Sequence, residues 1–194
     1  MTHQTQERTT RRLLHTRQVI CRGFERSDGL YEIEGRLHDS KSDDNDMFFK
    51  YVRAGEPIHQ MHLSLIIDLD LVIHGVEAHT EVGPTPYCTE INAVYAQLVG
   101  LKIGAGFKKR VLERVGGSLG CTHLTELLGP MATTAFQTTF FLKHRADLQP
   151  HERDPNHQVP RPWVIGTCHA YRADGDAVRL IWPDAEPSEP TTNG

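Results

Sequence analysis

The sequence predicts an α+β protein with a mainly antiparallel sheet and helices packed on one face of it. Two patterns predict this class. Residues 17–82 contain apolar runs bounded by turn residues, which is typical of strands. Residues 90–144 carry apolar side chains at three- and four-residue spacing, which is typical of amphipathic helices. At 194 residues with 38% hydrophobic side chains, the chain is long and apolar enough to bury one core.

The first elements of the chain are predicted to be strands. Residues 17–37 contain two strand-like runs around a Ser27-Asp28-Gly29 turn, which we interpret as a hairpin. Residues 61–82 contain two apolar runs around residues 68–70, and the pair His74-Gly75 in the second run favours a bulge. The polar residues 41–46 between the two hairpins predict a loop.

The second half of the chain is predicted to be mostly helical. We expect helices over residues 90–100, over residues 107–115, and from residue 122 to about 144. The pair Gly129-Pro130 is expected to kink or split the last helix. After it, residues 162–172 and 177–182 have strand character around an Asp174-Gly175 turn. The predicted fold therefore has additional strands near both termini.

Composition limits the organisation of the chain and its partners. We expect a flexible N-terminus over residues 1–16, a single α+β domain over residues 17–183, and a disordered tail over residues 184–194. The N-terminus lacks the apolar segment of a secretory signal, and no run reaches 18 apolar residues, so a cytoplasmic protein without a membrane span is expected. The net charge of -4 argues against a nucleic-acid partner. Exposed strand edges are compatible with a homodimer.

The cysteines favour metal binding or thiol chemistry over disulfides. The chain has four Cys and twelve His, and no secretory signal is visible. Cys88 and Cys121 each precede a Thr that is a candidate helix cap, so both thiols are predicted at helix N-termini, where the helix dipole favours the thiolate. Cys168 is expected to be a small buried side chain of a C-terminal strand.

Two histidine positions complete a candidate zinc site. His123 follows Cys121 by two residues, and both can bind one ion if Cys121 lies before the helix begins. His59 and His62 are three residues apart on a predicted strand, so they point to opposite faces and at most one joins a given site. Zinc prefers four ligands drawn from Cys, His and carboxylate. The predicted metal ligands are therefore His59, Cys88, Cys121 and His123.

Several segments resemble a known family. The runs are DGLYEIEGRL followed by Asp39 and Lys41, GEPIH followed by Met61 and Leu63, PYC, LVGLKIGAGF, GCTHLTELL and CHAYRADG, and GCTHL is the most specific of them. Over residues 22–183 the chain resembles the bacterial domain-of-unknown-function family 2889, which implies a link to the breakdown of aromatic and terpenoid compounds. The order of elements also resembles the iron–sulphur cluster scaffold fold, whose three cysteine positions fall at His59, Cys88 and Cys121. The histidine at the first position favours a single zinc or iron ion over a cluster.

These residues predict a metal-dependent enzyme, with zinc or iron, that acts by lyase or hydrolase chemistry on a small organic catabolic substrate, aromatic compounds included. The metal would polarise the substrate or activate water while three residues bind it, and His123 or His62 would act as general base. Two main alternatives stay open. One is a non-enzymatic metal or iron–sulphur carrier, and the other is a metal-free enzyme with Cys121 as nucleophile. The remaining hypothesis is an accessory subunit whose cysteines have only a structural role.

Overall fold

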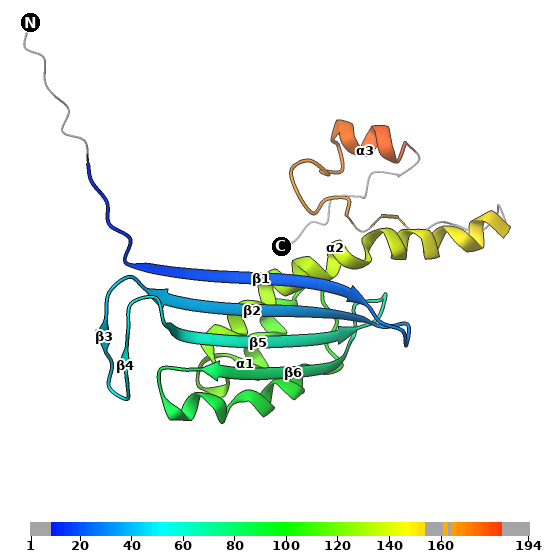
Figure 1. The fold of residues 1–194 in the computed structure, drawn as a ribbon. Helices are drawn as coiled ribbons and strands as arrows, with labels where there is room; N and C mark the ends of the chain where they lie inside the picture. Colours follow the sequence, from blue (N-terminus) through cyan, green and yellow to red (C-terminus); the bar gives the residue numbers. More distant parts are fainter. Residues whose placement is uncertain (1–8, 154–160, 163, 184–194) are drawn as a thin grey trace, which may run out of the picture. The chain divides into compact units, whose positions relative to one another are not determined.

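The computed structural model describes residues 9–153, 161–162 and 164–183 (Figure 1). The chain divides into two compact units, Met1–Phe140 and Phe141–Gly194, which are described one at a time. The expected single domain over residues 17–183 stays a prediction. Of the flexible N-terminus expected over residues 1–16, residues 1–8 lie outside the described residues and β1 already begins at His15; the disordered tail expected over residues 184–194 also lies outside them.

The first unit contains a four-stranded antiparallel sheet in the order β1-β2-β5-β6. Its strands are β1 (His15–Glu25), β2 (Tyr31–Lys41), β5 (Pro57–Ile67) and β6 (Ile73–Val82). A small hairpin of β3 (Asn45–Asp46) and β4 (Tyr51–Val52) lies between β2 and β5 in the chain. Both predicted hairpins and the α+β class are therefore confirmed, whereas part of the predicted loop over residues 41–46 is strand.

The predicted bulge in the last strand is also present. Ile66 pairs with Gly75 and Ile67 pairs with Ile73, so His74 is the extra residue on β6. A bulge of this kind leaves one residue unpaired and bends its strand.

Helices cover one face of this sheet. The core face of β2 and β5 consists of alternating buried side chains, as the two-residue period of a strand requires. Opposite them lie η2 (Asn92–Leu98), α1 (Phe107–Val115) and the first part of α2 (Thr122–Arg153). The view in Figure 1 places these helices behind the sheet. We call the helix-covered side the core face, and the opposite side the open face.

Two glycines let α2 approach the sheet closely. A Cβ atom at Gly35 on β2 would lie 2.5 Å from the Sδ atom of Met131, and one at Gly23 on β1 would lie 1.8 Å from the Oγ1 atom of Thr138. Neither separation is sterically allowed, so both positions need a residue without a side chain. Helix α2 therefore lies directly against β1 and β2, and its N-terminus is positioned by this contact.

Several sequence predictions for the helices need correction. Residues 92–98 form a 3-10 helix rather than an α-helix. Helix α2 continues through Gly129-Pro130 and ends at Arg153 instead of near residue 144, so the predicted split is wrong. The buried side chains Leu128 and Met131 flank this pair and anchor both sides of it in the same core, which compensates for the missing proline N–H.

The second unit lacks the predicted C-terminal strands within its described residues. Residues 164–175 form turns, and α3 (Asp176–Ile181) is a helix. Asp176 lies in its first turn and Arg179 in its last, and an ion pair of 3.0 Å joins them. Both placements suit the helix dipole and favour a helix where no partner strand is available. Cys168 is exposed, so its predicted burial in a strand is wrong.

Within the part of the chain that the structure describes, no helix combines the length and apolar composition that crossing a bilayer requires.

Candidate metal-binding site

Three potential metal ligands converge between the core face of the sheet and the start of α2. Ligand atoms of Asp39, His59 and His123 all lie within 4.8 Å of one another. Asp39 is near the end of β2, His59 is near the start of β5, and His123 is in the first turn of α2. Asp39 and His59 are directly paired across the two strands. We call these three residues the Asp39 cluster.

Strand alternation places a carboxylate inside the protein. Tyr31, Ile33 and Leu37 of β2 point to the core face, and Asp39 continues the same two-residue series. Its side chain is fully buried. A buried carboxylate is strongly unfavourable unless it is paired and hydrogen-bonded, so its partners define the electrostatics of the cluster.

Arg17 is the main partner of Asp39. Its Nε and Nη2 atoms each donate to one carboxylate oxygen at 2.8 Å, which is the bidentate geometry of a strong ion pair. His59 Nδ1 lies 3.0 Å from Oδ2, and His15 Nε2 lies 3.3 Å from Oδ1. Burial raises the pKa of Asp39, but the hydrogen bonds and charge of Arg17 outweigh it and lower this pKa below its ordinary value. Asp39 is therefore ionised at neutral pH.

The two histidines of the cluster are stacked and neutral. Their ring centroids are 3.7 Å apart, with an angle of 31° between the planes. Burial, followed by the charge of His123, lowers the pKa of His59. Burial, followed by the charge of Arg17, lowers the pKa of His123. The neutral imidazole is the form that binds metals, so the cluster presents its histidines in the ligating state.

A buried tyrosine fixes the N-terminus of α2. The hydroxyl of Tyr95 in η2 donates to the carbonyl of Cys121 at 2.8 Å and accepts from its N–H at 3.1 Å. Thr125 lies 2.7 Å from the same hydroxyl and donates to the carbonyl of Val115. Tyr95 is fully buried, and burial raises its pKa. This network holds the residue before the helix and thereby positions His123.

The rim of the cluster carries charge of both signs. Arg17 Nη1 lies 2.5 Å from Oε2 of Glu126, which is on the next turn of α2 after His123. The Arg17 side chain is 36% exposed and that of Glu126 is 53% exposed. Arg17 thus connects the buried carboxylate to the surface and presents a planar set of donors beside the cluster. Such a group is suited to bind the carboxylate of a substrate.

The structure brings some of the predicted site residues together. His59 and His123 are adjacent, and Cys121 Sγ lies 4.0 Å from His123 Nδ1. Cys121 immediately precedes α2, as predicted. Cys88 is part of the 3-10 helix η1 (Pro86–Thr89), with Thr85 Oγ1 3.2 Å from its Sγ, and is not a member of the Asp39 cluster. The assignment of Cys88 as a metal ligand stays a prediction.

His62 is on the other side of the sheet. It pairs across strands with Arg36 and His79, and the two-residue period directs it to the open face, away from His59. The prediction that His59 and His62 face opposite ways agrees with this register. A catalytic role for His62 together with the Asp39 cluster has no geometric support.

Asp39 and Arg17 are the site residues that sequence reasoning missed. The signal was present, because the core-face series of β2 continues from Leu37 to a charged residue. A carboxylate at a position that the strand period assigns to the core indicates a paired or ligating role. The partner Arg17 could not be found in this way, because its pairing with Asp39 depends on strand register.

The fold and the cluster define an α+β protein with a candidate metal-binding site beneath its sheet. Residues 15–137 match the family model described as Protein of unknown function (DUF2889), and the chain belongs to this family. The matched region contains all three residues of the Asp39 cluster. No curated protein and no solved structure matches the chain, so the resemblance to the iron–sulphur cluster scaffold fold is not confirmed.

Proposed function

We propose that this protein is a metal-dependent enzyme that binds zinc at Asp39, His59 and His123 and acts on a small organic substrate. The observation that carries the proposal is the convergence of one carboxylate and two neutral imidazoles within 4.8 Å. Three protein ligands leave a coordination position for water or substrate, as in catalytic zinc sites. The same ligand types also suit ferrous iron, which is the second choice of metal.

The arrangement favours hydrolase or lyase chemistry. A zinc ion at the cluster would polarise a carbonyl or hydroxyl oxygen of the substrate, or lower the pKa of a bound water. Arg17 Nη1, which is paired with the exposed carboxylate of Glu126, would bind a substrate carboxylate in its place, while the Nε and Nη2 atoms keep Asp39 ionised. Family resemblance extends the proposal to cytoplasmic breakdown of small compounds, including aromatic ones.

Metal content is the first test of this proposal. The purified protein should retain or take up about one zinc per chain, and the His59→Ala and His123→Ala variants should bind it at least about 100-fold more weakly, because each loses a direct ligand. The matched control is His62→Ala, which removes a histidine of the same strand from the open face. Equal zinc affinity in all four proteins would contradict the proposed ligand set.

An open coordination position distinguishes an enzyme from a carrier. Cobalt(II) substituted for zinc should give a visible spectrum that changes when azide or a small carboxylate is added, because the anion enters the open position. Arg17→Gln should weaken the response to the carboxylate more than the response to azide. A cobalt spectrum that no anion changes would favour a closed site and a carrier function.

A thiol enzyme is the second candidate, and one contact favours it. Cys121 Sγ lies 4.0 Å from His123 Nδ1 and immediately precedes the N-terminus of α2, where a thiolate is stabilised. Under this alternative, iodoacetamide should alkylate Cys121 in the metal-free protein faster than the exposed Cys168, and His123→Ala should remove the difference. Slow alkylation of Cys121 at neutral pH would exclude its role as an activated nucleophile.

A further inference from the structure

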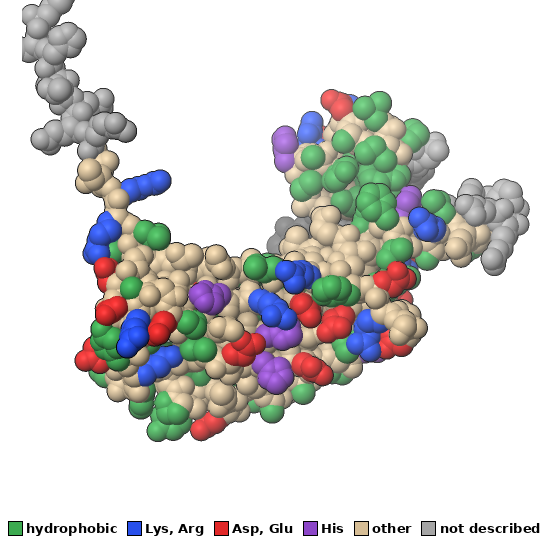
Figure 2. All heavy atoms as spheres, viewed as in Figure 1, with side chains coloured by type: hydrophobic (Ala, Val, Ile, Leu, Met, Phe, Trp, Pro, Cys, Tyr) green, Lys and Arg blue, Asp and Glu red, His purple; other side chains and the backbone are tan. Residues whose placement is uncertain are grey.

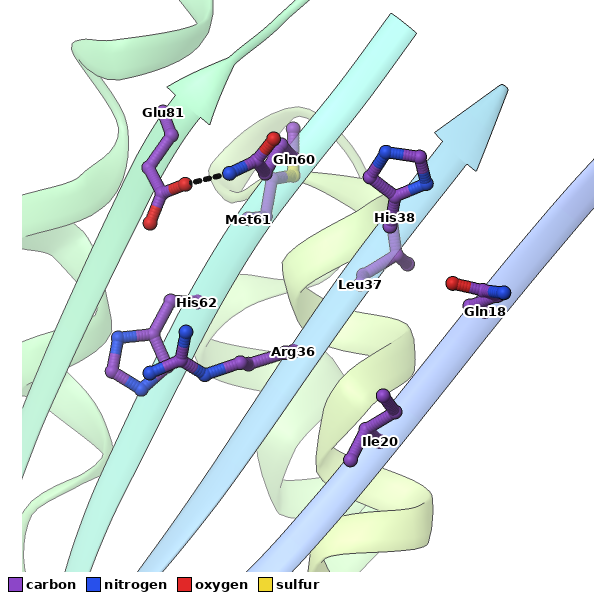
Figure 3. A pocket seen from close by; sticks show the side chains of 9 residues that line it. All are labelled: Gln18, Ile20, Arg36, Leu37, His38, Gln60, Met61, His62 and Glu81. Carbon is purple, nitrogen blue, oxygen red and sulfur yellow. Dashed lines mark hydrogen bonds between the residues drawn. The ribbon is translucent and has the colours of Figure 1, made fainter. Parts of the chain in front are cut away.

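A second pocket lies on the open face of the sheet. Its volume is about 220 Å³, and all four strands of the sheet contribute to it. Its lining includes Ile20 of β1, Arg36 of β2, Gln60 and His62 of β5, and Glu81 of β6 (Figure 3). Figure 2 shows histidine, basic and acidic side chains gathered over the central strands on this side. The pocket is thus separate from the Asp39 cluster, which lies on the core face.

One polar atom in this pocket lacks a partner. The Nε2 atom of His62 is buried and forms no hydrogen bond with the described residues. Buried polar atoms in folded proteins are nearly always hydrogen-bonded, to the protein, to water or to a ligand. Because this nitrogen is buried, the imidazole of His62 forms part of the pocket wall, and the accessible donors of the pocket come from its neighbours.

The guanidinium group of Arg36 lies beside His62. Arg36 of β2 is directly opposite His62 of β5, and Figure 3 shows their side chains next to each other. The charged neighbour of Arg36 is Glu34, whose carboxylate is 3.9 Å away, too far for a hydrogen bond. The side chain of Arg36 is 56% exposed, so its donors remain accessible to an anion. Arg36 and His62 together form the basic end of the pocket.

A bulge places a carboxylate at the opposite end. Gln60 pairs with Val82 and Met61 pairs with Thr80, so Glu81 is the extra residue on β6. Its side chain accepts a hydrogen bond from Gln60 Nε2 on the open face (Figure 3). Bulges often redirect a side chain next to a functional site. Since β2 and β6 are two strand spacings apart, roughly 9.6 Å, Arg36 and Glu81 flank the pocket across β5.

From these features we infer that the open-face pocket binds a small organic carboxylate that carries a hydrogen-bond donor at its far end. The carboxylate binds the exposed guanidinium of Arg36, which lies beside the imidazole of His62. The donor group binds Glu81, and the exposed side chain of Ile20 lies along the apolar body of the molecule. The volume is below the range of drug-sized pockets, which limits the ligand to the size of a single ring or a short chain.

The experiment uses 4-hydroxybenzoate and benzoate as rigid probes, because they differ only in the donor opposite the carboxylate. Calorimetric or NMR titration of the whole protein should show binding of both, with 4-hydroxybenzoate tighter by about 3- to 10-fold. Arg36→Gln should weaken both probes by about 10-fold or more. Glu81→Ala should abolish the preference for the hydroxyl while benzoate binding remains.

Two controls separate this site from other sources of binding. The titrations use metal-free protein, so that no carboxylate binds through a metal at the Asp39 cluster. Arg22→Gln removes an arginine of β1 that does not line the pocket, and His59→Ala disrupts the Asp39 cluster on the core face; in both variants the binding that depends on Arg36 should equal that of the wild type. Failure of zinc binding would therefore leave this result unchanged. The inference is overturned if neither probe binds, if Arg36→Gln binds as tightly as the wild type, or if Glu81→Ala keeps the preference for the hydroxyl.

Discussion

The two faces of the same sheet use histidine in opposite ways. His59 and His62 are three residues apart on β5, and their partners across the sheet on β2 are Asp39 and Arg36. On the core face, burial under α2 keeps His59 neutral beside an ionised carboxylate and a second imidazole. On the open face, His62 lies beside a cation at the edge of a pocket. The difference shows that two features determine the chemical role of a histidine on this sheet: whether a helix packs over it, and which residue is paired with it on the neighbouring strand.

Removal of the buried carboxylate is expected to have the largest effect. Asp39→Ala leaves Arg17 and His59 without their acceptor, and it should reduce the free energy of unfolding by about 3–5 kcal/mol. Urea denaturation of the metal-free protein measures this change. Glu126→Gln is the matched control, because it removes the exposed partner of the same arginine and should cost at most about 0.5 kcal/mol. A loss of similar size in both variants would contradict the central role of Asp39.

Acidification is expected to have the second-largest effect on the stability of the folded protein, through the two histidines of the core face. The pKa values of His59 and His123 are lowered in the folded protein, so the unfolded chain binds more protons as the pH falls below about 6.5. Stability is therefore full above this pH and falls as the pH decreases toward the folded pKa values. Thermal unfolding of the metal-free protein between pH 7.5 and 5 should show a decreasing Tm.

A histidine substitution tests the origin of this pH dependence. His123→Gln should flatten the decrease in Tm, because it removes one of the two groups with a lowered pKa. His79→Gln, which removes an exposed histidine of the open face, should leave the profile unchanged. If both variants keep the wild-type profile, the buried histidines do not control the acid response.

The tyrosine under the site should have a smaller effect on stability. Tyr95→Phe removes the hydroxyl that bonds both backbone groups of Cys121, and it should cost about 1–3 kcal/mol. Because the same hydroxyl positions α2, zinc affinity should fall as well, although every proposed ligand is still present. A Tyr95→Phe protein with unchanged stability and zinc affinity would show that the network does not position His123.

Open-face substitutions should affect stability least. Arg36→Gln changes an exposed side chain whose ion pair with Glu34 is long, so unfolding free energy should change by about 0.5 kcal/mol or less. Urea denaturation under the conditions used for Asp39→Ala gives a direct comparison of the two faces. A loss as large as that of Asp39→Ala would remove the contrast between them.

Much of the first unit could be predicted from the sequence. The two hairpins, the bulge at His74 and the helix over residues 107–115 follow from alternation, turn residues and apolar spacing, which are local properties. His59 and His123 were also grouped in one predicted ligand set, His59 through the resemblance to the scaffold fold and His123 through its spacing from Cys121, and their rings are adjacent in the structure. The C-terminal strands were predicted wrongly, because apolar runs without a partner strand do not form a sheet.

The charged part of the site depends on long-range register. Arg17 meets Asp39 because β1 and β2 pair in one register, and Glu126 meets Arg17 because α2 packs against those strands. Neither relation leaves a local pattern in the sequence. The open-face pocket depends in the same way on the bulge at Glu81, which only the pairing of β5 with β6 reveals.

The most direct test of the account is the position of a bound metal. Crystals of the zinc-loaded protein, measured at the zinc absorption edge, should give an anomalous peak about 2.0–2.2 Å from ligand atoms of Asp39, His59 and His123. A peak on the open face, or one bound by cysteines without His59 and His123, would contradict the proposed centre.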